Sequence, residues 1–278
     1  MRYYIFRAIK FLVLLFPRWF CYSCAVLLGR VYGMLARKDR EALAYNLRAF
    51  FPEEHVRKII PKVFINFSYY LVDFFRYDKL DRKFIERNVT IHGREHIDDA
   101  LKRGKGAILL TAHIGNYELG GAVSALLGYD MHVVALPHKD IRVNRMFNNQ
   151  REKVGLKVIA TGAMVKECFK VFTNNSVMGL LGDRSFGGKK IPVKMFGRTA
   201  ALPRGFVFFV LSSDTALVPA FLVRQKNRYK YDLFFEPPII AMGRLEAEIA
   251  ADYAKVLERY VSMYPEQWYM FIKFWDVE

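Results

Sequence analysis

From residue 88 onward, short apolar runs alternate with amphipathic segments, and this alternation restricts the fold more than any other feature. The runs with the length of buried strands are residues 89–92, 106–112, 131–136, 156–159, 177–182, 216–223 and 229–235. Helical periodicity is found over residues 53–78, 96–103, 117–128, 142–154, 163–173, 203–213 and 245–263. The pattern predicts a single α/β domain with helices flanking a central sheet. Because the last two strands follow each other closely, we expect that sheet to be mostly parallel or mixed.

The N-terminal 36 residues differ from the rest in composition. Residues 3–16 are apolar except for Arg7 and Lys10, and residues 19–36 carry a single charge, Arg30. The segment lacks the small-residue cleavage site of a signal peptide and is marginally short for a span, which needs about twenty apolar positions. It fits one tilted span, an interfacial helix pair or a core helix. We expect residues 1–36 to anchor the chain to a membrane and residues 37–278 to form the α/β domain.

The charge balance points to an anionic partner. The chain has 43 Lys and Arg against 27 Asp and Glu, a net charge of +16. Nucleic acid and anionic lipid are the usual partners of such a surface. No zinc-ligand pattern, basic heptad region or RNA-binding signature is present in the sequence, so we expect no nucleic-acid partner and favour lipid headgroups.

Residues 106–120, GAILLTAHIGNYELG, contain the strongest candidate site. A buried strand is expected to end at Ala112, so that His113 emerges at its carboxyl end, where open α/β sheets bind their ligands. Gly115 permits a tight turn, and Asn116 is a good cap for the following helix. Across such a strand–turn–helix junction, Glu118 could accept a hydrogen bond from the His113 imidazole. The pair predicts a general base, because a carboxylate stabilises the imidazolium that forms when histidine takes a proton.

Several blocks of the sequence resemble one protein family. AHIGNYELGG is similar to the H-x-G-N-W-E signature of bacterial lipid A biosynthesis acyltransferases, within the lysophospholipid acyltransferase superfamily with its H-x-x-x-x-[DE] motif. NRMFNNQREKVG (144–155), MFGRTAALPRGFVFFVLSSDTALVPAF (195–221) and PEQWYMFIKFW (265–275) resemble further family blocks in the same order. The fold implied is that of the glycerol-phosphate acyltransferases.

The resemblance implies an enzyme that moves a fatty acyl chain from an acyl-carrier-protein or acyl-CoA thioester to a hydroxyl of a lipid A precursor or related glycolipid. His113 and Glu118 would be catalytic, with backbone N–H groups near Gly115 or a nearby arginine stabilising the oxyanion. The residues implied to bind substrate are Asn116, Arg151, Asp183, Arg184, Arg198 and Arg204. The implied location is the cytoplasmic face of the bacterial inner membrane.

Other features limit this interpretation. Tyr117 stands where the family usually has tryptophan, and the W-x-H-R-R sequence that often follows P-E-Q is absent, which leaves the acceptor open. A lysophospholipid or an aminolipid is an alternative acceptor, and a non-catalytic membrane-binding protein is an alternative of another class. Of the remaining histidines, only His138 is placed to line the site. No metal-ligand spacing, phosphate loop or dinucleotide fingerprint is found, so we expect no metal and no organic cofactor.

Overall fold

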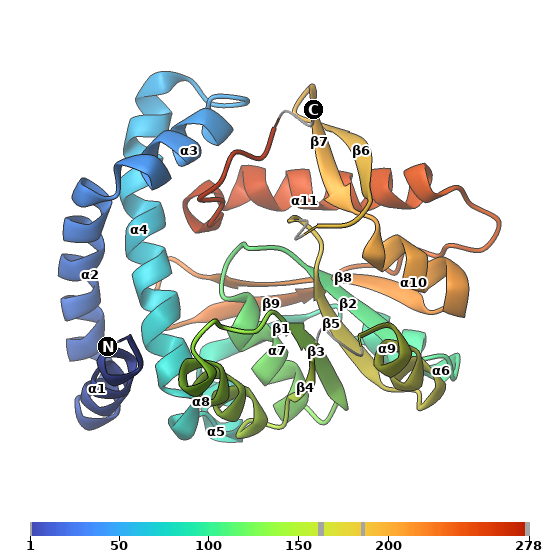
Figure 1. Cartoon of the computed structure of the whole chain (residues 1–278), viewed down its shortest axis with the longest axis horizontal. Coiled ribbons are helices and arrows are strands. Elements are labelled where there is room, and N and C mark those ends of the chain that lie inside the picture. The colour runs from blue at the N-terminus through green and yellow to red at the C-terminus, as the bar shows by residue number, and fades with distance from the viewer. Residues whose placement is uncertain (1, 161–163, 185–186, 276–278) are drawn as a thin grey trace.

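The computed structural model describes residues 2–160, 164–184 and 187–275, and within them a seven-stranded mixed sheet forms the centre of the molecule (Figure 1). The strand order is β1-β9-β8-β2-β5-β3-β4. The strands are β1 (Val89–His92), β2 (Ala107–Thr111), β3 (Met131–Ala135), β4 (Lys157–Ala160), β5 (Val177–Leu181), β8 (Ala216–Arg224) and β9 (Tyr231–Phe235). All neighbours pair in parallel except β8 and β9, which are antiparallel. The predicted α/β class and mixed sheet are therefore confirmed.

Helices cover both faces of the sheet. Ile108 and Leu110 of β2 belong to a buried cluster with side chains of α9 (Met164–Thr173), α10 (Gly205–Ser213) and α11 (Glu246–Met263). Ala107 and Leu109, on the opposite face, pack in a second cluster with α6 (Arg94–Lys102) and α7 (Tyr117–Leu126). The remaining elements of this layer are α5 (Arg82–Asn88) and α8 (Ile141–Glu152). A central strand that is apolar on both faces is what a sheet between two helical layers requires. For the helix expected over residues 163–173, residue 163 lies outside the described residues, and α9 covers the remainder.

The N-terminal helices pack together beside the sheet (Figure 1). They are α1 (Arg2–Leu15), α2 (Arg18–Leu35), α3 (Arg37–Leu47) and α4 (Glu53–Phe75). Glycines let α2 lie close along α4, because a Cβ on Gly29 would approach Ser68 Oγ to 2.5 Å. The boundary expected at residue 36 therefore does not coincide with a break in packing. Among the described residues no single helix has the length and apolarity to cross a membrane; α2 and α3 pass that test as a pair, but they meet at 87°.

A two-stranded hairpin was not expected from the sequence. β6 (Lys190–Met195) and β7 (Arg198–Pro203) pair antiparallel above α11 (Figure 1). Ile191, Val193 and Met195 of β6 are buried, whereas the residues between them are exposed. This period-two pattern is the signature of a half-buried strand. Beyond α11 the described residues form a short 3-10 turn, Pro265–Gln267, and continue without a helix or strand to residue 275.

Candidate active site

The turn between β2 and α7 positions His113. Gly115 has φ +63°, and a Cβ there would lie 2.1 Å from the carbonyl oxygen of Leu222, so both the backbone conformation and the space require glycine. Asn116 caps α7, because its Oδ1 accepts a hydrogen bond of 3.1 Å from the backbone N–H of Leu119. The turn and cap predicted from the sequence are both confirmed.

Asp183 holds the imidazole of His113. The ring Nδ1 lies 2.7 Å from Asp183 Oδ1, and the backbone N–H of His113 donates to Asp183 Oδ2 at 2.8 Å. Because a carboxylate only accepts hydrogen bonds, Nδ1 carries the proton and Nε2 is left as the basic nitrogen. Burial alone would raise the pKa of Asp183, but His113 and Arg184 together hold it below its ordinary value. An ionised carboxylate behind a histidine is the arrangement of a general base.

The predicted partnership of Glu118 with His113 is wrong as a hydrogen bond. Within the described chain Glu118 instead accepts from Arg151 of α8, at 3.0 Å from Nε and 2.6 Å from Nη2. Both side chains are largely buried, and burial lowers the pKa of Arg151, but Glu118 together with Tyr70 and Tyr77 raises it above its ordinary value, so the guanidinium stays charged. The physical reason is that Asp183 already accepts the hydrogen bond from Nδ1 of His113. In addition, a guanidinium that donates two hydrogen bonds binds the Glu118 carboxylate more strongly than a single imidazole N–H would.

His113 lies in the wall of a cavity of about 940 Å³ at the carboxyl ends of the central strands. Most of the wall is apolar, with side chains from β3, β5, α8 and α10. Its polar side chains are Tyr70, Thr111, His113, Tyr117, Glu118, Ser124, His138, Arg151, Arg184, Lys189 and Arg204. His138 therefore lines the site as predicted, and burial followed by the nearby Arg151 lowers its pKa. A long apolar chain with a polar end fits such a cavity.

The other predicted site residues fall into two groups. Arg184 and Arg204 line the cavity; Arg184 also donates to the carbonyl of Tyr269, and Arg204 pairs with Glu246 at 2.7 Å from Nε. Arg198 is exposed at the start of β7 and is not part of the cavity wall. Asn116 is buried beneath the turn, with its side-chain amide committed to Leu119 and Asp73. The substrate contact that the resemblance implied for Asn116 is therefore not available in this arrangement.

The C-terminal segment fixes the backbone of the turn from the other side. Gly115 N donates to Gln267 O at 2.9 Å, and Tyr269 N donates to His113 O at 2.7 Å. Asn116 N donates to Leu222 O at 2.7 Å. The backbone donors of Gly115 and Asn116 are thus already bonded, so they do not form the oxyanion site expected from the sequence.

The fold places a buried histidine–carboxylate pair at a large, mostly apolar cavity, an arrangement that suits an α/β enzyme with a long apolar substrate. The model of the family described as bacterial lipid A biosynthesis acyltransferase matches residues 1–276, so the chain belongs to this family and is an acyltransferase.

Curated relatives agree with this assignment. The chain is 24% identical to the lipid A biosynthesis acyltransferase of Haemophilus influenzae over 245 residues, 87% of this chain and 77% of the relative. It is 25% identical to the lipid A biosynthesis palmitoleoyltransferase of Escherichia coli, over 89% and 83% of the two chains. It is also 22% identical to the phosphatidylinositol mannoside acyltransferase of Mycobacterium tuberculosis, over 76% and 68%. Among solved structures, the 1-acyl-sn-glycerophosphate acyltransferase of Thermotoga maritima matches with TM-score 0.43 and 12% identity, covering 89% of this chain and 99% of that one.

Proposed function

We propose that this protein transfers a fatty acyl chain from an acyl-carrier-protein or acyl-CoA thioester to a hydroxyl of a lipid A precursor or a related glycolipid. The observation that carries the proposal is His113, which lies in the wall of a mostly apolar cavity of about 940 Å³ and is bonded through Nδ1 to the buried Asp183. Family membership supports acyl transfer, and the names of the lipid A and phosphatidylinositol mannoside relatives support a glycolipid acceptor.

His113 acts as the general base. Its Nε2 takes the proton of the acceptor hydroxyl, and the resulting alkoxide attacks the thioester carbonyl. The tetrahedral intermediate collapses, the C–S bond breaks, and the thiolate leaves with the proton returned from the imidazolium. Asp183 holds the ring in the required tautomer and stabilises the imidazolium in between.

The oxyanion requires a donor other than the turn backbone. Arg184 is the best placed, because it follows Asp183 in sequence and lines the cavity. Its guanidinium is held by the carbonyl of Tyr269, which leaves further N–H groups for a substrate oxygen. A fixed cation at the developing charge is typically worth several kcal/mol in the transition state.

Glu118 and Arg151 form the polar wall against which the acceptor lies. Three Arg151 nitrogens are used within the protein, two by Glu118 and one by Asn148 at 3.3 Å. The Glu118 oxygens keep lone pairs that accept from a sugar hydroxyl. We assign Arg204, at the cavity wall, to a phosphate of the acceptor or of the donor's phosphopantetheine.

The protein acts, in this proposal, at the cytoplasmic face of the bacterial inner membrane. Large apolar side chains are exposed along α1 and α2, among them Phe11 at 65%, Leu28 at 66% and Leu35 at 77%. An apolar face of this size on a basic chain suits the interface of an anionic bilayer. Anchoring by the N-terminal helices would bring the cavity to its lipid acceptor.

Activity is tested with purified full-length protein, acyl-carrier-protein and acyl-CoA donors, and a panel of lipid A precursors, other glycolipids, lysophospholipids and aminolipids. Products are identified by lipid mass spectrometry. We expect thioester consumption that depends on a glycolipid acceptor. Transfer to lysophospholipid alone would show that the acceptor is a lysophospholipid and not a glycolipid. No transfer with any acceptor would contradict the proposed activity.

Membrane binding is tested by substitutions in the full chain, because truncation would also remove side chains that are buried in the body. Replacing exposed Leu28 and Leu35 by serine should lower sedimentation with vesicles of anionic lipid. The matched control replaces exposed Met242 and Leu245, which lie outside α1 and α2, by serine. Equal loss in both variants, or in neither, would argue against an N-terminal anchor.

A further inference from the structure

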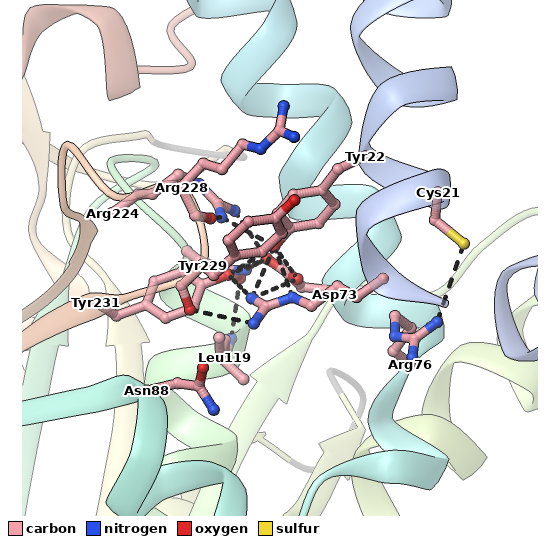
Figure 2. A network of polar contacts seen from close by, with 12 residues as sticks. Cys21, Tyr22, Asp73, Arg76, Asn88, Leu119, Arg224, Arg228, Tyr229 and Tyr231 are labelled. Carbon is pink, nitrogen blue, oxygen red and sulfur yellow. Dashed lines mark hydrogen bonds and ion pairs between the residues drawn. The ribbon is translucent and has the colours of Figure 1, made fainter. Parts of the chain in front are cut away.

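A buried carboxylate connects the N-terminal helices to the turn that carries His113. Asp73, near the end of α4, accepts hydrogen bonds from two side chains of α2, at 2.6 Å from Tyr22 Oη and 3.2 Å from Arg18 Nη2. Its second oxygen accepts from Arg224 at 2.8 Å and from the Tyr231 hydroxyl. Figure 2 shows Tyr22, Arg224 and Tyr231 gathered around this carboxylate.

The same carboxylate also bonds the turn. Asn116 Nδ2 donates to Asp73 Oδ2 at 3.1 Å, while Asn116 Oδ1 caps the first turn of α7. An amide offers a donor on one side and an acceptor on the other, so an acceptor-only carboxylate at Nδ2 determines that Oδ1 faces Leu119 N. The orientation of the cap therefore depends on Asp73 being ionised and correctly placed.

The surroundings of Asp73 keep it ionised. Burial alone would raise the pKa of Asp73, but Arg224, Arg18 and the two tyrosine hydroxyls hold it below its ordinary value. Tyr22 remains a neutral donor, because burial raises its pKa to about 12. Removing either arginine would leave a buried charge poorly paired, whereas removing one hydroxyl leaves both arginines in place to pair the carboxylate.

We propose that Asp73 is a positioning residue for the catalytic turn, and that α2 acts on the site through the chain Tyr22–Asp73–Asn116. This inference rests on the proposed function in that the turn carries the general base. The outer side of α2 exposes Leu28 and Leu35, and its inner side supplies Tyr22 and Arg18. The helix proposed to contact lipid thus also holds the turn that must be in place for chemistry.

The experiment compares two hydroxyl deletions on one helix. Tyr22→Phe removes a donor to Asp73, whereas Tyr32→Phe removes an exposed donor, at 2.8 Å from Asp39, that does not reach the turn. We expect Tyr22→Phe to lower kcat about tenfold with KM and vesicle binding unchanged, since a displaced reacting group costs rate. Tyr32→Phe should match the wild type. In a His113→Ala background Tyr22→Phe should cause no further loss.

Hydrogen exchange provides a readout that is independent of activity. The backbone N–H of Leu119 should exchange faster in Tyr22→Phe than in Tyr32→Phe, because its cap is loosened.

Asn116→Ser, which retains a capping oxygen but lacks the amide donor, should show the same kcat loss with a nearly normal melting temperature. If the protein transfers no acyl group, the function has failed and the exchange comparison alone decides the inference. Equal kcat, or equal Leu119 exchange, in the two tyrosine variants would overturn it.

Discussion

Two pairs of side chains, Asp183–His113 and Glu118–Arg151, contribute residues to the cavity wall, and they differ in what they offer to a substrate. Asp183–His113 joins two strand ends, whereas Glu118–Arg151 joins two helices. His113 and Glu118 come from one short stretch of sequence, yet each finds its partner in a distant segment. In the first pair only Nδ1 of the imidazole is bonded to the carboxylate, which leaves Nε2 as the basic nitrogen, whereas in the second pair the carboxylate is held by two nitrogens of a guanidinium. In the proposed mechanism, proton transfer is therefore assigned to the first pair and substrate positioning to the second.

The largest expected effect is the loss of acyl transfer when His113 is removed, and it distinguishes the two pairs directly. His113→Ala removes the base and should lower acyl transfer by about 10²–10⁴-fold, with the melting temperature little changed. The measurement is thioester consumption by the purified variant. His55→Ala, at an exposed position of α4, is the matched control and should keep full activity. If His113→Ala turned over substrate at the wild-type rate, the proposed mechanism would be contradicted.

Asp183→Asn tests whether the first pair works as a unit. The amide can still contact Nδ1 but does not stabilise an imidazolium, so we expect kcat to fall by roughly 10²–10³-fold. The double variant with His113→Ala should be little worse than His113→Ala alone, because residues that act together are not additive. Additive losses would mean that Asp183 acts independently of His113.

The second pair should give a smaller and different effect. Glu118→Gln keeps the shape but removes the charge opposite Arg151, so we expect about a tenfold loss in kcat/KM, mainly through KM for the acceptor. Arg151→Lys should behave similarly, since it loses the bidentate contact. Steady-state kinetics with varied acceptor measures both. A loss in kcat as large as that of Asp183→Asn would erase the distinction between the pairs.

The first pair follows from strand register once the order of the strands is known. Thr111 of β2 pairs with Leu181 of β5, and His113 and Asp183 each lie two positions beyond that pair. Strands that are parallel neighbours deliver such residues to the same edge. What the sequence did not reveal was that β2 and β5 are neighbours, since strand order depends on contacts between distant segments. Proximity in sequence favoured Glu118 instead, and this signal was misleading.

Local patterns predicted most elements, and their failures have physical causes. The strand expected over residues 106–112 is β2 (Ala107–Thr111), and the helix over 117–128 is α7 (Tyr117–Leu126). The β6–β7 hairpin was not predicted, although Ile191 and Val193 alternate with exposed neighbours, because those neighbours are lysines and a proline, which are rare in strands. The Asp73 network was not predictable either, since its members come from five separate segments.

The smallest expected effect concerns stability and pH. The pKa of Asp183 is lowered in the folded protein, so its ionised form stabilises the fold above its unfolded pKa of about 3.9. That contribution is lost as the pH falls through the lower folded value, where the wild-type side chain becomes neutral like asparagine. We therefore expect Asp183→Asn to lower the free energy of unfolding by roughly 1–3 kcal/mol at pH 7, and the difference to shrink below about pH 4. Denaturant unfolding of both proteins across this range measures it. Arg198→Ala, at an exposed site outside the cavity, is the control and should show no such convergence. A difference that stays constant with pH would mean that Asp183 is not the ionised partner of His113, and the contrast between the two pairs would fail with it.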